Sequence, residues 1–150
     1  MRMKDKVPIY IGFELRRSTK GSQNLRSGNE MISSNDRLNY HVKSELTQHL
    51  RLIGNQEGRQ RIGDMANGEH QYSKKNPCHI VVHVHPPSAR RMDAPNWYPT
   101  IKPLIDGLTD AGMFEDDNND VITAFIFLPG PKTDNKKYFI LLEVRDGPFV

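Results

Sequence analysis

Residues 78–128 read CHIVVHVHPPSARRMDAPNWYPTIKPLIDGLTDAGMFEDDNNDVITAFIFL, and they decide the fold. The first eight alternate apolar and polar side chains, which is typical of a half-buried strand. An apolar stripe at helical spacing follows, and then a second, nearly continuous apolar run. A strand, a helix and a strand in this order predict an α/β chain.

Working outward, Val7 to Leu15 predicts a first strand, and a stripe that begins at a cap on Ser34 or Asn35 predicts a helix ended by Gly54. The last run, YFILLEV at 138–144, predicts a strand that forms a hairpin with VITAFIFL, both being apolar on both faces. The sequence therefore predicts β-α-β-α-β-β, a mixed sheet with helices packed on it, in a single domain spanning 1–150.

Two features of this plan stay open. The second helix either has Thr100 as its N-cap or begins near Asn96 and kinks, because Pro99 and Pro103 complicate its start. Residues 16–33 and about 55–76 are polar and rich in glycine, which predicts two mobile loops.

Charge is distributed unevenly along the chain. The net charge is only +3, but Lys and Arg dominate the first 61 residues, whereas acids concentrate between 93 and 120. This division suits a polyanionic ligand handled with a metal ion. The single cysteine, Cys78, is typical of a reducing compartment, and no run approaches the ~20 apolar residues of a membrane span, so we expect a cytoplasmic protein.

The acidic stretch predicts a metal site if its carboxylates converge. Two carboxylates about 4 Å apart repel by roughly 4 kcal/mol at an effective dielectric of 20, so convergence of Asp93, Asp116 and Asp117 requires a cation. An ordinary ion pair of Lys102 with Asp106, and solvated acids elsewhere, are the simpler interpretation of the same residues.

Three histidines, His79, His83 and His85, share one face of the strand at 78–85. Ligands about 7 Å apart on one strand rarely converge on zinc, so we interpret them as a polar sheet face that contacts DNA rather than as a zinc site.

The spacing of the charged residues resembles that of a known family. The pattern is Arg90-Arg91-x-Asp93, Asn96, Lys102-x3-Asp106-x-Leu108, Gly112 and Asp116-Asp117, followed by a strand. It resembles the RusA family of Holliday junction resolvases, small endonucleases widespread in phages and prophages. The resemblance is strongest over Ile80 to Leu128, and the stretch NDRLNYHVKSELTQHLR also looks like the family's first helix.

This resemblance implies a RusA-like fold and a homodimer that cuts two opposed strands of a four-way DNA junction symmetrically. The implied cofactor is Mg²⁺, with Mn²⁺ as a substitute. The implied catalytic residues are Asp93, Lys102, Asp116 and Asp117, and the implied metal ligands are Asp93, Asp106, Asp116 and Asp117. We expect Arg16, Arg17, Lys20, Arg90, Arg91 and Asn96 to contact DNA, and the apolar final strands to supply the dimer interface. If the gene is carried by a phage, the compartment is the host cytoplasm.

One departure from the family pattern matters. The family motif is Asp-x-Asp-Asn-x-x-Lys, whereas here Pro95 replaces the second acid and three residues are inserted before Lys102. Either Asp106 or Glu115 completes the metal site, or activity is lost. The alternatives are therefore a protein of the same fold that binds branched DNA without cutting it and, as a third class, a histidine-ligated zinc hydrolase of small substrates.

Overall fold

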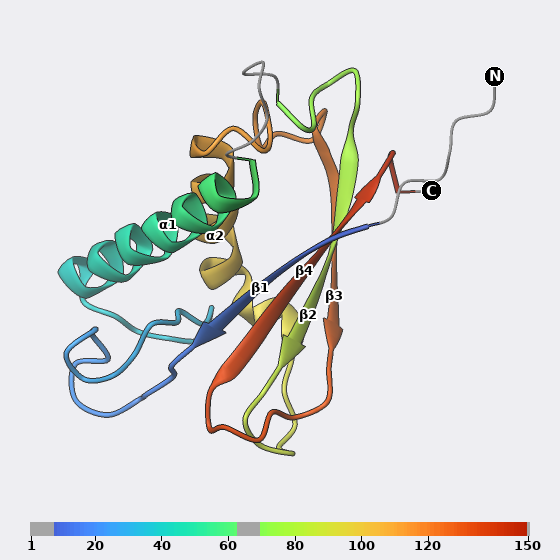
Figure 1. Ribbon diagram of the computed structural model, residues 1–150. Coiled ribbons are helices and arrows are strands. Elements are labelled where there is room, and N and C mark those ends of the chain that lie inside the picture. Colours follow the sequence, from blue (N-terminus) through green and yellow to red (C-terminus); the bar gives the residue numbers. More distant parts are fainter. Residues whose placement is uncertain (1–7, 63–69, 150) are drawn as a thin grey trace.

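The computed structural model describes residues 8–62 and 70–149. In these ranges four strands form one mixed sheet in the order β1-β4-β2-β3, with two α-helices on one side of it (Figure 1). The elements are β1 (Ile9–Leu15), α1 (Tyr40–Ile62), β2 (Cys78–His85), the 3₁₀-helix η1 (Ala94–Trp97), α2 (Tyr98–Asp110), β3 (Ile122–Pro129) and β4 (Tyr138–Asp146). The predicted element order and mixed α/β class are confirmed.

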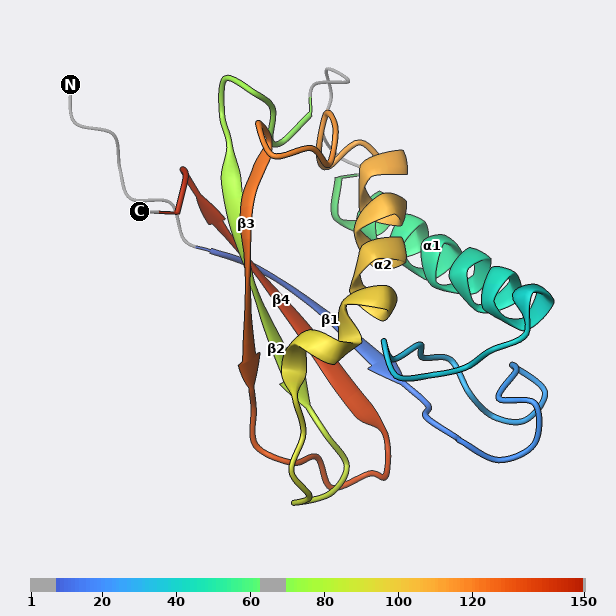
Figure 2. The same cartoon turned by 180° about the vertical axis from the view of Figure 1, so that it is seen from behind.

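Strand β2 forms the centre of the sheet together with β4. Cys78, Ile80, Val82 and Val84 are fully buried, and the residues between them are half-exposed, as the alternation predicts. Because α2 carries the chain from β2 across to β3, these two strands pair in parallel. Figure 2 shows α2 running alongside the sheet, from the end where β2 stops toward the end where β3 begins.

The predicted terminal hairpin is wrong. Strand β4 pairs with β1 and β2, so β2 lies between β3 and β4. The crossover through α2 places β3 beside β2. The connection from β3 to β4 then passes the end of β2, where the Gly130 amide donates a hydrogen bond to the Val84 carbonyl (2.8 Å). Consequently β4 is central, as predicted, but β3 is an edge strand with half-exposed side chains.

The predicted end of α1 at Gly54 is also wrong, because the helix continues to Ile62. A Cβ on Gly54 would lie 2.3 Å from the Leu104 carbonyl oxygen, and one on Gly107 would lie 2.1 Å from the Arg51 carbonyl oxygen. Both glycines therefore allow α1 and α2 to touch backbone to backbone. The loop predicted at 55–76 is helical in its first part, and its residues 63–69 lie outside the described ranges.

Neither helix begins with the cap residue first considered. The side chain of Asn39, not of Ser34 or Asn35, accepts a hydrogen bond from the His41 amide (2.8 Å) at the start of α1. The second helical segment begins as η1 and continues as α2, so the alternative of a start near Asn96 is the better one. Thr100 lies inside α2, where its hydroxyl bonds the Ile32 amide and carbonyl, both at 2.8 Å.

The chain between β1 and α1 has no regular secondary structure, as predicted for 16–33, but it contributes to the core. Met31 and Ile32 are buried, and the fully buried Asn29 amide donates to the carbonyls of Gln23 and Met31 at 2.9 Å each. This segment thus packs under the start of α2 as part of the domain.

The face of the sheet opposite the helices carries no further element among the described residues. The strand register places Tyr10, Val81, Ile126 and Leu141 on it, together with the β2 histidines.

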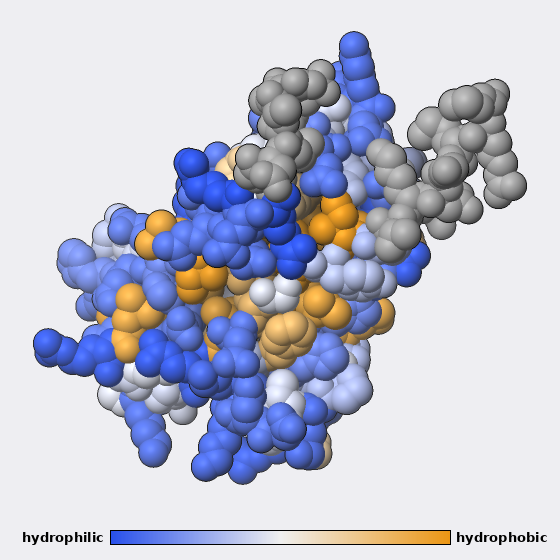
Figure 3. Space-filling view, in the orientation of Figure 1, coloured by the Kyte–Doolittle hydropathy of each residue, from blue (hydrophilic) through white to orange (hydrophobic). Residues whose placement is uncertain are grey.

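In the view of Figure 3, apolar side chains gather across the middle of the molecule and hydrophilic ones surround them. No helix in the described part of the chain has the length and apolar character needed to cross a membrane.

Because α1 and α2 approach so closely at Gly54, a glycine-to-alanine substitution there should lower the free energy of unfolding rather than raise it. Glycine to alanine in an exposed helix normally stabilises by about 1 kcal/mol. Gly54→Ala should instead destabilise by about 1–3 kcal/mol, because the added methyl group meets the Leu104 carbonyl. Urea unfolding followed by circular dichroism measures this, with the exposed Gln56→Ala as control, expected within about 0.5 kcal/mol of the parent. A Gly54→Ala protein more stable than the parent would contradict the packing.

Candidate active site

Lys102 joins two of the predicted acidic residues. Its ammonium donates to an Asp106 carboxylate oxygen at 2.6 Å and also to the Asp117 carboxylate. Lys102 and Asp106 lie one turn apart on α2, whereas Asp117 comes from the connection between α2 and β3. Three of the predicted site residues therefore converge, which an isolated surface ion pair would not require.

The connection before β3 is anchored so that Asp117 faces α2. Met113 and Phe114 are fully buried, and Phe114 stacks on Tyr72 with ring centroids 5.9 Å apart. The Glu115 amide donates to the Tyr72 carbonyl at 2.9 Å, which pins the chain just before the acidic pair. Asp117 is therefore placed by burial of its neighbours in sequence.

Asp116 has a local role in the same connection. Its carboxylate accepts the Asp117 amide at 2.7 Å and the Asn118 side-chain amide at 3.2 Å. These contacts shape the turn, and the residue is exposed. The two adjacent acids are thus not equivalent, since only Asp117 contacts Lys102.

The close carboxylates shift each other's pKa in opposite directions. Hydrogen bonds with Asp106 and then with Lys102 lower the pKa of Asp117 to about 2. Burial and then the hydrogen bond with Asp117 raise the pKa of Asp106, against the effect of Lys102. Burial alone would lower the pKa of Lys102, but its hydrogen bonds with both acids outweigh burial and raise it. Lys102 and Asp117 therefore stay charged, whereas ionisation of Asp106 is disfavoured.

Asp93 is not part of this cluster and lies before η1, the 3₁₀-helix that leads into α2. It is the N-cap residue of η1, its side chain is 62% exposed, and its nearest charged partner is Arg91 at 3.9 Å. The expected convergence of Asp93 with Asp116 and Asp117 is not seen in the part of the chain that the structure describes. Nor do three or more His, Cys, Asp or Glu side chains among those residues form a group that could hold a metal ion.

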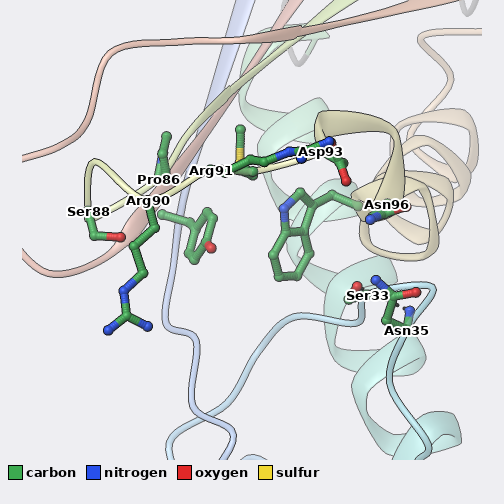
Figure 4. A pocket seen from close by; sticks show the side chains of 11 residues that line it. Ser33, Asn35, Pro86, Ser88, Arg90, Arg91, Asp93 and Asn96 are labelled. Atoms are coloured by element: carbon green, nitrogen blue, oxygen red, sulfur yellow. Dashed lines mark hydrogen bonds and ion pairs between the residues drawn. The ribbon is translucent and has the colours of Figure 1, made fainter.

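Asp93 instead borders an open cavity of about 410 Å³ (Figure 4). The cavity is lined by Ser33, Asn35, Pro86, Ser88, Arg90, Arg91, Met92, Asp93, Asn96, Trp97 and Tyr138. Three residues expected to contact DNA, Arg90, Arg91 and Asn96, are therefore brought together here. The predicted site residues therefore separate into two groups, one around the cavity before α2 and the other formed by α2 with the connection that follows it.

The three residues after β1 that we expected to contact DNA differ in how far other residues of the protein already bind them. Arg17 is committed to the fold, because its guanidinium binds the Asp36 carboxylate through two hydrogen bonds of 2.8 and 2.7 Å. Arg16 pairs with Glu30 at 3.1 Å but stays half-exposed. Lys20 is exposed, and its ammonium contacts no described residue. Of these three cations, Lys20 is the most available to a phosphate.

The histidines of β2 do not share a partner. His79 bonds the Gly147 carbonyl, His85 bonds the Pro131 carbonyl, each at 2.9 Å, and His83 bonds Glu143 at 2.7 Å. Glu143, only 6% exposed, also pairs with Arg145. The row is therefore a polar sheet face with separate local contacts, and nothing in it draws three imidazoles to one point.

Sequence reasoning missed the aromatic wall of the cavity. Trp97 was predicted only as part of an apolar stripe, and Tyr138 only as the start of a strand. Their rings meet at a centroid distance of 4.9 Å, which needs the end of β2, η1 and the start of β4 to come together. The aromatic character at both positions was visible in the sequence, but their contact spans 41 residues and had no local signal.

Comparison with known proteins assigns no family. No protein-family model matches the chain, and no curated protein matches it either. Among solved structures, the chain is similar to thiamine-monophosphate kinase from Stenotrophomonas maltophilia, with 12% identity and a TM-score of 0.27. That match covers 94% of this chain and 32% of the kinase chain, so the chain spans about a third of that protein's length. A likeness this distant carries no argument about fold or activity.

The cluster predicts a pH-dependent effect of removing its cation. Lys102→Met leaves two neighbouring carboxylates without a counter-charge, so it should lower stability near pH 7 by about 1 kcal/mol, a small figure because the site is partly exposed. In the parent, Asp117 contributes stability above pH about 4 that is lost as pH falls toward about 2. In the variant, loss of Lys102 should raise the already raised pKa of Asp106 further, so the stability deficit of the variant relative to the parent should shrink as the pH falls and Asp106 takes up a proton.

Urea unfolding at these pH values measures the difference, with Lys43→Met, an exposed lysine of α1, as the matched control. Equal pH profiles for the Lys102→Met and Lys43→Met proteins would show that the three side chains do not interact.

Proposed function

We propose that this chain is a RusA-like endodeoxyribonuclease that uses Mg²⁺ to hydrolyse phosphodiesters in branched DNA, with the four-way junction as its substrate. The observation that carries the proposal is the contact of Lys102 with both Asp106 and Asp117. This arrangement brings a cation and two carboxylates from distant parts of the sequence to one partly exposed place. Metal-assisted phosphoryl transfer uses acids that bind the metal ion together with a cation that stabilises developing negative charge.

The donor set at this place fits Mg²⁺. The ion commonly binds through one or two carboxylates and completes its shell with water and phosphate oxygens. Asp106 and Asp117 supply two carboxylates. The Lys102 ammonium contacts both, so their combined negative charge already attracts one cation. Bound there, Mg²⁺ would polarise the phosphoryl group and lower the pKa of a water molecule. Mn²⁺, which accepts the same oxygen ligands, would substitute.

Lys102 then has a distinct task in hydrolysis. Its raised pKa keeps the side chain charged at neutral pH. When the acids are engaged by a metal ion, the ammonium is available to a phosphate oxygen on which negative charge develops. Asp116 contributes by holding the turn that presents Asp117.

Exposed cations outside the Lys102 cluster would hold the DNA backbone. Arg90 and Arg91 are exposed in the connection after β2, and Lys20 is exposed in the chain after β1. Contacts of such residues with phosphates give binding that weakens steeply with salt. They position the substrate without reading its sequence.

A homodimer suits a substrate with two-fold symmetry, because two copies would cut two opposed strands. In β4 the buried Ile140, Leu142 and Val144 belong to the intramolecular core, so that strand has no apolar surface on its helix side for a partner. Strand β3 is a sheet edge, and its Leu128 is 43% exposed. Of the two apolar strands proposed for the interface, only β3 lies at an edge of the sheet, whereas β4 offers a partner only its open face.

A second candidate function is favoured by the position of Asp93. Pro95 stands where the family has a second acid, and Asp93 does not join the Lys102 cluster. A protein of the same fold that binds branched DNA without cutting it would have no need of a third metal ligand. Its DNA contacts would be the same arginines and lysine.

The two functions separate in one cleavage assay. A synthetic four-way junction with labelled strands is incubated with the protein and Mg²⁺, and the products are resolved by length. The parent should produce paired nicks near the crossover, and Asp117→Asn should lower the rate by about 100-fold or more, as loss of a main electrostatic group does. Asp120→Asn, an exposed acid of the same connection, is the matched control and should cut normally.

Binding of the junction without nicks would favour the DNA-binding alternative. Nicking by Asp117→Asn at the parent rate would move the active site away from Lys102.

Metal binding is testable without activity. If Lys102 holds the place of a cation between two acids, Lys102→Met should bind Mg²⁺ more tightly than the parent. The melting temperature of the variant should therefore rise more with millimolar Mg²⁺ than that of the parent. Adding Asp106→Asn and Asp117→Asn to Lys102→Met should abolish the rise. A rise that persists without both carboxylates would place the metal elsewhere.

A further inference from the structure

The cavity at the start of α2 has the size and walls of a ligand site. Its volume of about 410 Å³ falls within the ~300–1,000 Å³ usual for small-ligand pockets. Its lining comes from the segment before α1, the connection after β2, η1 and the first residue of β4. Figure 4 shows Ser88 and Arg90 on one side of the cavity and Ser33 and Asn35 on the other.

One wall is aromatic and rigidly supported. The Trp97 and Tyr138 rings meet at 4.9 Å with an interplanar angle of 57°. The Arg17 guanidinium lies 5.1 Å from the centroid of the Trp97 ring, and Asp36 holds that guanidinium with two hydrogen bonds. The indole is therefore fixed before any ligand arrives, which reduces the entropy lost on binding.

Tyr138 adds a neutral donor to this wall. Its hydroxyl makes no hydrogen bond with any residue in the described ranges, and the ring is only half-buried. Burial raises the pKa of Tyr138, so the phenol keeps its proton at neutral pH. An aromatic ring with an unused hydroxyl group can both stack on a planar ligand and bond its polar edge.

The rim favours an anion. Arg90 is exposed and forms no ion pair with a described residue, and Arg91 approaches only Asp93, at 3.9 Å. Asp93 is the single carboxylate among the lining residues, so the two arginines leave a net positive charge. Asn35 and Asn96 add amide groups that can donate and accept hydrogen bonds. Bare phosphate would leave the aromatic wall unused, whereas a nucleotide uses both parts.

We propose that this cavity binds one unpaired nucleotide of the DNA substrate, with the base against Tyr138, which packs on the buried Trp97, and the phosphate held by Arg90 and Arg91. The proposal deepens the proposed function and rests on it for the source of the nucleotide. Bases at a branch point are the cheapest to unstack, because they already lack a continuous duplex on both sides.

Trp97 is the only tryptophan of the chain, so its fluorescence reports on this cavity. The full-length protein is titrated in EDTA, which prevents cutting, with a junction that carries one unpaired thymidine at the branch. The comparison is the same junction with an abasic residue at that position. Base stacking contributes about 1–3 kcal/mol, so the thymidine junction should bind about tenfold more tightly and quench the tryptophan more strongly. Thymidine monophosphate alone should bind more weakly than either DNA.

Two variants and a control identify the parts of the cavity. Tyr138→Leu should abolish the preference for thymidine over the abasic residue, provided that its thermal unfolding shows a folded protein. Arg90→Gln should weaken binding of both junctions alike and reduce the slope of log K against log salt by about one. Lys43→Gln, an exposed charge on α1, should change neither preference nor quenching.

Equal affinity and equal quenching for the thymidine and abasic junctions would overturn the proposal, as would thymidine monophosphate binding more tightly than DNA. A folded Tyr138→Leu protein that keeps the preference would also overturn it. The nuclease is judged separately in Mg²⁺. Paired nicks without a base preference would refute only the nucleotide pocket, whereas a base-dependent signal without nicks would refute only the nuclease.

Discussion

The position of α2 is the constraint on which the rest of the structure depends. One side of the helix is completely buried and consists of Ile101, Leu104, Ile105 and Leu108. Gly54 and Gly107 bring it into backbone contact with α1, so it can neither rotate nor slide without a clash. The remaining exposed stripe, on which Lys102 and Asp106 stand, is therefore fixed in direction by packing.

The same helix links the two candidate sites. Before its N-terminal end, η1 and the connection after β2 form the cavity with the two arginines. Beyond its C-terminal end, the connection to β3 returns Asp117 to Lys102, because Met113 and Phe114 are anchored in the core. A substrate that contacts both sites would cross η1 and α2, with its backbone at the arginines and its phosphodiester near the acids that we propose bind the metal ion. Such a division of binding from chemistry is consistent with a nuclease acting on an extended polyanion.

Local pattern was enough to predict much of the fold. The alternation in β2 located its boundaries and buried face. The family resemblance placed Lys102, Asp106 and Asp117 in one site together with Asp93 and Asp116, and the first three are in contact, whereas Asp93 is not part of that cluster. The errors came from long-range packing. Gly54 resembles a helix end in the sequence, but it is a contact point with Leu104, a residue fifty positions away. The two final strands read as a hairpin because local turn residues join them, whereas the earlier crossover had already placed β2 between them.

We propose that Asp106 and Asp117 bind the metal ion in place of the Lys102 ammonium. A crystal structure of the protein with a four-way junction and Mn²⁺, with the ion located by its anomalous scattering, would locate the site. We expect an ion within about 2.2 Å of oxygen atoms of both Asp106 and Asp117, with the Lys102 ammonium moved toward a DNA phosphate. An ion bound only at Asp93 or at the β2 histidines, with the Lys102 contacts unchanged, would contradict it.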